Sequence, residues 1–174
     1  PHEIFDACAT RQLTVGSLTL EILAVSDIDG LLDHYAAAHE HVEQEIPYFA
    51  VLWDSALGLA NHLVERYGDL CGKRVVELGC GLGLCSIVAA KLGAKVLATD
   101  FHPDCEAFLL RNAARNGVEL DFMALDWRDV PQQIKPFDMV LASDVLYHAP
   151  SLSSLVGAAC GLCHKPDGRI LISD

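Results

Sequence analysis

The fold is decided by residues 75–100, which read VVELGCGLGLCSIVAAKLGAKVLATD. An apolar run leads into a turn with three glycines, a helix-like segment follows, and a second apolar run ends at Asp100. This pattern predicts a buried strand, a tight turn, a helix and a second buried strand. A glycine turn lets the backbone approach a ligand, and a carboxylate that closes the second strand can bind the hydroxyls of a ribose.

The spacing of the glycines narrows the choice of ligand. They stand at 79, 81 and 83, and position 84, where a dinucleotide fingerprint has its last glycine, is Leu. Glu77 adds a second acid just before the turn. The pattern therefore favours adenosine without a pyrophosphate and disfavours a nicotinamide-dependent oxidoreductase.

From Lys73 onward, the alternation of strand and helix patterns repeats. Strands are predicted at 74–79, 95–100, 120–125, 137–143 and 169–173, with helices at about 84–92, 103–115 and 151–163. Alternating strands and helices predict an α/β fold with a doubly wound, Rossmann-like, mostly parallel sheet. In such a sheet the ligand belongs at the carboxyl ends of the strands, where the strand order reverses.

The segment before this sheet has a different pattern. Residues 1–46 are predicted to form an N-terminal extension and residues 47–174 the ligand-binding domain. Within the extension we expect a hairpin over 11–25, where apolar residues alternate around a Gly-Ser turn, and a helix over about 27–44. Another helix is expected to open at position 54 or 55.

The composition excludes several classes of function. Hydrophobic residues make up 52% of the chain and charged residues 21%, which indicates a folded domain. The net charge of -12 repels phosphate backbones, so we expect no nucleic-acid partner. Apolar runs of only strand length predict no membrane partner. Seven scattered cysteines, an odd number, favour a reducing, cytoplasmic setting over a disulfide framework.

Polar and aromatic residues gather at the ends of four predicted strands. They are the glycine turn, Asp100, Asp126 with Trp127, and the segment from Ser143 to Tyr147. We expect one shared cleft there, in which Asp126 accepts a hydrogen bond from an adenine amino group and Trp127 lies against the ring. Plainer interpretations stay open: a helix cap for Asp100, a turn and core packing for Asp126 and Trp127.

These residues resemble a class I, seven-β-strand S-adenosylmethionine-dependent methyltransferase. The segment 47–56, PYFAVLWDSA, is similar to the Trp-containing segment that precedes the first fold helix in the protein-lysine methyltransferases of methyltransferase family 16. The turn that begins at Glu77 and the DVLY motif at 144–147 fit the same group. The resemblance covers roughly residues 46–174.

The resemblance implies S-adenosylmethionine as the cofactor. Its expected binding residues are Trp53, Glu77, Gly79, Gly81, Gly83, Asp100, Asp126, Trp127 and Ser143. Asp144 and Tyr147 are expected on the substrate side as catalytic residues, because an acid can accept hydrogen bonds from an amine and an aromatic ring can surround a developing cation. No metal site is expected, since the CxxCH pattern at 160–164 is interpreted as helix packing.

The expected activity is N-methylation, with a protein lysine side chain as acceptor. A small-molecule amine methyltransferase and a non-catalytic interaction module that keeps the fold are the alternatives. The family's usual sheet continues beyond a fifth strand, whereas this chain stops at Asp174. We therefore expect a truncation after the fifth strand, and an open edge through which the chain could form an oligomer.

Overall fold

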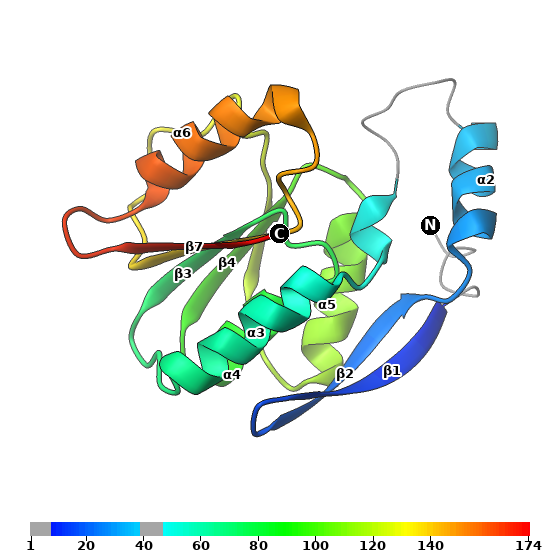
Figure 1. Cartoon of the computed structure of the whole chain (residues 1–174), viewed down its shortest axis with the longest axis horizontal. Coiled ribbons are helices and arrows are strands. Elements are labelled where there is room, and N and C mark those ends of the chain that lie inside the picture. Colours follow the sequence, from blue (N-terminus) through cyan, green and yellow to red (C-terminus); the bar gives the residue numbers. More distant parts are fainter. Residues whose placement is uncertain (1–7, 39–46) are drawn as a thin grey trace.

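The computed structural model describes residues 8–38 and 47–174 (Figure 1). Its centre is a five-stranded, all-parallel sheet in the order β5-β4-β3-β6-β7. The strands are β3 (Arg74–Leu78), β4 (Lys95–Asp100), β5 (Asp121–Ala124), β6 (Met139–Ser143) and β7 (Arg169–Ser173). The predicted α/β class is confirmed, and the strand order reverses between β3 and β6.

Helices cover both faces of this sheet (Figure 1). They are α3 (Asp54–Arg66), α4 (Leu84–Lys91), α5 (Cys105–Arg115) and α6 (Leu152–Leu162), with short 3-10 turns η2 (Tyr48–Ala50) and η3 (Ala149–Ser151). Successive strand residues point to opposite faces: Val75 packs with α3, α4 and α5, while Val76 packs with α6. Burial on both faces explains why the strands read as continuous apolar runs.

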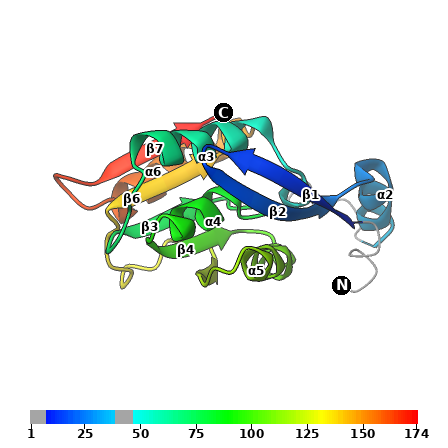
Figure 2. The same cartoon turned by 90° about the horizontal axis from the view of Figure 1, so that it is seen from below.

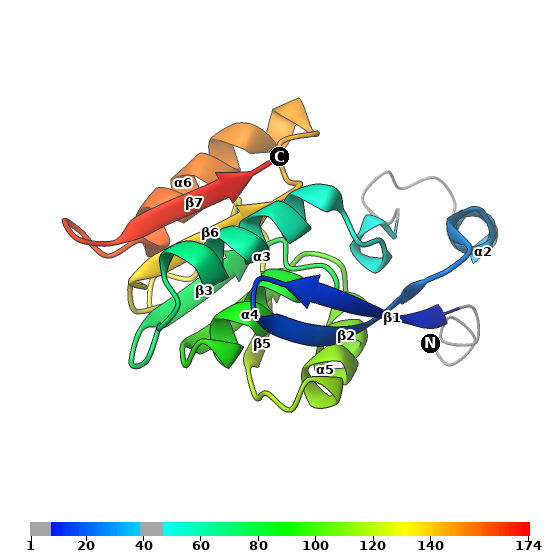
Figure 3. The same ribbon diagram turned by 60° about the horizontal axis from the view of Figure 1, so that its bottom comes forward.

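The hairpin consists of β1 (Cys8–Val15) and β2 (Leu18–Val25), and it packs outside the layer of α3, α4 and α5 (Figures 2 and 3). Two side chains, one in α5 and one directly after its last residue, pair with the backbone of β2. Asn112 accepts from the Leu23 N–H at 2.7 Å, and Asn116 accepts from the Glu21 N–H at 3.0 Å. The amides thus act as a substitute for a neighbouring strand, and they join the hairpin to the core of the domain.

Most predicted elements agree with the structure, with local differences. The predicted strand over 137–143 begins only at Met139. Phe137 lies outside it and forms an isolated parallel bridge to Cys163. The predicted helix over 103–115 starts at Cys105, after a turn. Helix α2 spans Ile28–Ala38, and the rest of the helix predicted to residue 44 lies outside the described residues.

Within residues 8–38 and 47–174, no helix combines the length and the apolar character that crossing a membrane requires.

Candidate functional site

The glycine turn connects β3 to α4 at the point where the strand order reverses. Gly79, Gly81 and Gly83 all adopt positive φ, at 72°, 50° and 84°. A Cβ on Gly83 would stand 2.1 Å from Leu109 Cδ1, so this glycine is required for packing against α5. A Cβ on Gly81 would stand 3.2 Å from the carbonyl oxygen of Phe49. The backbone before α3 therefore lies directly on the turn.

Asp100 lies beside this turn, at the carboxyl end of β4. One carboxylate oxygen accepts from the Gly81 N–H at 2.9 Å, and the other accepts from the His102 N–H at 3.0 Å. The residue is partly exposed, and Phe101 after it is 49% exposed. The structure thus fixes a carboxylate at the switch point and leaves each oxygen with capacity for a further hydrogen bond.

Trp127 follows the end of β5 and borders the same turn. Two of its ring carbons come within 4.0 Å of a Cβ built on Gly79, the closer at 3.5 Å. The adjacent Asp126 is held by a bidentate ion pair with Arg128, at 2.6 Å for the shortest contact. The Arg128 guanidinium lowers the pKa of Asp126. Asp126 therefore presents a carboxylate already engaged by a neighbour, and its proposed adenine contact stays a prediction.

Glu77 takes a different position from the other predicted cofactor residues. It is only 1% exposed, and its carboxylate accepts from the Ser86 N–H at 2.8 Å and from the Ser86 hydroxyl at 2.5 Å. Burial raises the pKa of Glu77 to about 7, against the opposing effect of Ser86. In this position Glu77 supports the start of α4 beneath the turn, and a direct cofactor contact from it stays a prediction.

Asp144 follows β6, across the switch point from Asp100. It is the one non-glycine residue with positive φ, at 53°, in the described part of the chain. The Ser55 hydroxyl of α3 donates a hydrogen bond to its carboxylate. A backbone strain of this kind is held only where the surroundings fix it, and it is common at functional sites. Ser143 before it is buried and hydrogen-bonds to Cys85, so it faces α4.

Three exposed aromatic side chains lie together and come from the segments next to Ser55 and Asp144 in the chain. Tyr147 is 71% exposed, and its ring meets the ring of Tyr48 edge-on at 5.7 Å. Tyr48 also lies 6.3 Å from Trp53, whose indole N–H donates to the Tyr48 carbonyl at 3.1 Å. Burial, Asp100 and Tyr48 together raise the pKa of Tyr147. We call Tyr48, Trp53 and Tyr147 the aromatic wall.

Sequence reasoning missed three residues of this site. Tyr48 lies inside the segment that carried the resemblance, but only the fold shows that its ring links Trp53 to Tyr147. Ser55 was considered only as a helix start, yet its hydroxyl bonds Asp144, 89 positions later. Phe101 could have been found, because the sequence shows an aromatic residue directly after the acid that closes a predicted strand.

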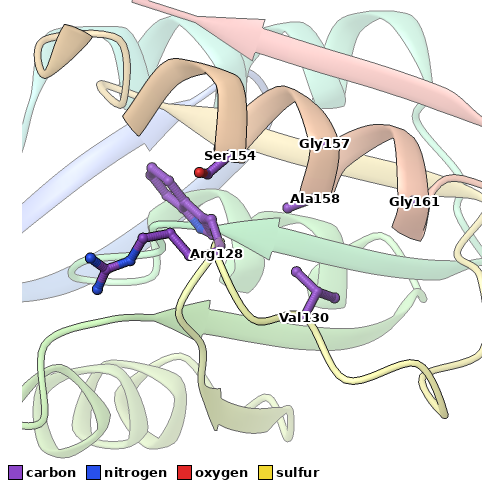
Figure 4. A pocket seen from close by; sticks show the side chains of 7 residues that line it. Arg128, Val130, Ser154, Gly157, Ala158 and Gly161 are labelled. Atoms are coloured by element: carbon purple, nitrogen blue, oxygen red, sulfur yellow. The ribbon is translucent and has the colours of Figure 1, made fainter. Parts of the chain in front are cut away.

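A cavity of about 300 Å³ lies on another side of Trp127, between the chain after β5 and α6 (Figure 4). Arg128 and Val130 line one side, and Ser154, Gly157, Ala158 and Gly161 of α6 line the other. It includes neither the glycine turn nor Asp100. Of the strand-end residues that the sequence predicts, this cavity shares only Trp127.

The chain is similar to several known methyltransferases. A family model described as lysine methyltransferase matches residues 37–173. The protein-lysine methyltransferase METTL21E of Mus musculus is 39% identical over 132 residues, covering 68% of this chain and 53% of its own length. A ubiquinone biosynthesis O-methyltransferase of Xanthomonas euvesicatoria is 33% identical over 106 residues, covering 60% and 44%.

Among solved structures, a T. thermophilus 16S rRNA methyltransferase in complex with AdoMet and guanosine superposes with a TM-score of 0.72. The match covers 95% of this chain and 42% of the other at 15% identity, so it shows the fold alone. The chain spans about half the length of the curated relatives it matches.

Proposed function

Since this chain belongs to the lysine methyltransferase family, we propose that it is part of an S-adenosylmethionine-dependent N-methyltransferase whose acceptor is a protein lysine side chain. The observation that carries the proposal is the Asp100 carboxylate, fixed by the Gly81 and His102 N–H groups at the switch point of a parallel sheet. In such sheets this crevice is where nucleotide-like ligands bind. The family match and METTL21E add the acceptor class.

The donors around the turn fit the adenosine half of the cofactor. The Asp100 carboxylate, which also accepts a hydrogen bond from the Cys105 thiol, keeps acceptor capacity for the hydroxyls of a ribose. Phe101 and Trp127 stand at the ends of adjacent strands and offer flat apolar surface for a base. We assign the remaining cofactor contacts to Trp53, Gly79, Gly81, Gly83, Glu77, Asp126 and Ser143. The cofactor, when bound, supplies a methyl group already activated for transfer.

The acceptor side is assigned to Asp144 and the aromatic wall, in which Trp53 serves both the cofactor and the acceptor. A lysine amine must arrive neutral and aligned, and one proton must leave it. The Ser55 bond orients the Asp144 carboxylate, which then accepts a hydrogen bond from the amine and takes up that proton. The rings of Tyr48, Trp53 and Tyr147 provide faces for the positive charge that develops on nitrogen.

A small-molecule acceptor is the second candidate. It is favoured by the ubiquinone biosynthesis relative, which is 33% identical over 106 residues. An exposed aromatic wall at the surface argues for the protein acceptor, because a side chain on a large partner can reach it without being enclosed.

The test is to incubate the protein with tritiated S-adenosylmethionine, once with a cell lysate and once with a pool of free amines. Label on protein lysine supports the proposal, and label only on free amines replaces it by the second candidate. Asp144→Asn should abolish labelling while S-adenosylhomocysteine still binds. Asp167→Asn, an exposed acid in the turn before β7, is the control that should label normally. Cofactor binding with no turnover on any acceptor would indicate a non-catalytic module.

A further inference from the structure

One group of metal-ligating side chains contains two cysteines that have no assigned role. The sulfur atoms of Cys80 and Cys105 lie 3.6 Å apart, and a carboxylate oxygen of Asp100 lies within 4.8 Å of both. None of the seven cysteines of the chain forms a disulfide. The sulfur separation is far longer than the ~2.05 Å of a disulfide, so these two are thiols in contact. We call Cys80, Asp100 and Cys105 the thiol trio.

We propose that the thiol trio binds a thiophilic divalent cation of the zinc class, and that this cation and the cofactor exclude each other. The spacing suits a tetrahedral ion: with metal–sulfur bonds of ~2.3 Å, two sulfur ligands stand about 3.8 Å apart. Two thiolates and a carboxylate leave one tetrahedral position open. Soft sulfur ligands select zinc and cadmium over magnesium or calcium.

The position of the trio explains how the ion would enter and how its ligands are held. Cys80 lies within the glycine turn, Cys105 is the first residue of α5, and Asp100 closes β4, so three separate elements fix the ligands. Both cysteines are buried, while Asp100 is partly exposed and gives the approach from solvent. The Cys105 thiol now donates to the Gly81 carbonyl at 3.0 Å, a contact that the metal bond would replace.

The exchange balances in atoms and charge. Two S–H bonds break, two metal–sulfur bonds form, one carboxylate–metal bond forms, and two protons leave to solvent, with no change in oxidation state. Before binding the trio carries the single negative charge of Asp100. Afterwards, two thiolates, one carboxylate and a divalent cation again sum to one negative charge. The ion therefore adds no net charge to this largely buried site, which would otherwise oppose its binding.

The exclusion rests on the proposed function, whereas the metal site does not. Asp100 is the acid assigned to the ribose, and its two oxygens are already held by backbone N–H groups. A carboxylate that turns one oxygen to a metal loses the geometry for two hydroxyls. The thiol trio would thus make methyl transfer sensitive to zinc, through a ligand that the reaction itself requires.

The test is a titration of the protein with Cd²⁺, kept reduced with a phosphine, and followed by the ultraviolet absorption of cadmium–thiolate bonds. The exposed or partly exposed Cys8, Cys71, Cys160 and Cys163 are first replaced by Ser to remove background sites. We expect one Cd²⁺ per chain with two thiolate ligands. Cys80→Ser and Cys105→Ser should each weaken binding about 100-fold, and Cys85→Ser, a buried thiol outside the trio, should not. Equal uptake by the Cys80→Ser/Cys105→Ser double variant, or none by the parent, overturns the site.

A second measurement separates the site from the proposed function. Excess S-adenosylhomocysteine should raise the apparent Kd of Cd²⁺ at least tenfold in the same chain, with the thiol trio intact. If Cd²⁺ binds with the same Kd whether or not S-adenosylhomocysteine is bound, the metal site stands. The mutual exclusion and the ribose role of Asp100 are then overturned. Binding of S-adenosylhomocysteine without any uptake of Cd²⁺ would keep the cofactor assignment and overturn the metal site.

Discussion

The side chain of Asn112 forms two hydrogen bonds with the backbone of Leu23, accepting from its N–H at 2.7 Å and donating to its carbonyl at 3.1 Å. The same amide donates to the Leu82 carbonyl, in the glycine turn, at 3.0 Å. Asn112 is fully buried. One residue of α5 therefore ties the hairpin and the turn together, although they lie about 60 positions apart in the chain.

The first prediction concerns the stability that Asn112 provides. Asn112→Ala leaves the buried N–H of Leu23 and two carbonyls without their partner, and we expect a loss of about 2–4 kcal/mol in the free energy of unfolding. Asn61→Ala is the control, because Asn61 accepts one exposed bond from the Gly16 N–H and donates otherwise only to the Leu57 carbonyl of its own helix. It should lose only ~0.5–1 kcal/mol. Urea titration measures the free energy of unfolding of both variants. Equal losses would contradict the role of Asn112 in joining the hairpin to the glycine turn.

The second prediction concerns Asp100 as the ribose acid. Asp100→Asn keeps the size of the side chain but removes its charge and turns an amide donor toward one of the two N–H groups that hold it. Each hydrogen bond to a charged group contributes ~1.5–3 kcal/mol, so we expect S-adenosylhomocysteine to bind about 10–100-fold more weakly. Isothermal titration calorimetry measures this. Asp121→Asn, at the exposed start of β5, should bind as the unmodified chain does.

Much of the fold could be predicted from the sequence because its signals are local. Apolar runs bounded by Gly79 and Gly93 mark the first strand–helix unit, and the hairpin follows from the alternation around Gly16. The strand-end acids could also be found, since each closes an apolar run. The parallel order then places the Gly81 N–H nitrogen 2.9 Å from an Asp100 carboxylate oxygen, while the shared cleft itself stays a prediction.

The rest of the site depends on contacts that no local pattern encodes. Phe49 covers Gly81 and packs on His102 with ring centroids 4.4 Å apart, from a segment about 30 residues upstream. Asp126 forms its ion pair with Arg128, and the spacing of charged residues in the sequence does not show which of them will pair. The orientation of Glu77 toward Ser86 depends on how α4 begins, since a strand residue can face either side.

The third prediction uses the raised pKa of Glu77. Its value of about 7 in the folded chain exceeds the ordinary 4.5, so between these pH values the folded chain holds a proton that the unfolded chain has released. This stabilisation is complete below about pH 4.5 and is lost as the pH rises to about 7.

Glu77→Gln removes this dependence, because an amide stays neutral. Thermal unfolding from pH 5 to 8 should therefore show the unmodified chain losing on the order of 2–4 kcal/mol relative to the variant. Glu65→Gln, an exposed position on α3, should follow the unmodified chain throughout. Parallel curves for Glu77→Gln and the unmodified chain would mean that the buried carboxyl does not titrate in this range.

The fourth prediction concerns the aromatic wall as the place where the acceptor amine is held. Tyr48 contacts both other rings and, at 41% exposed, keeps a face open to solvent. Removing one ring that faces a cation weakens its binding by ~0.5–2 kcal/mol, so Tyr48→Ala should raise the KM for the acceptor about 2–30-fold. Tyr48→Phe keeps the ring and should stay within about twofold. The Kd for S-adenosylhomocysteine should be unchanged in both, because Tyr48 is assigned to the acceptor and not to the cofactor. Steady-state kinetics with a lysine-containing protein substrate, together with calorimetry, measures the two constants separately.

A rise in both constants for Tyr48→Ala would place this ring at the cofactor. Equal values of KM for the Ala and Phe variants would mean that the aromatic wall does not hold the cation.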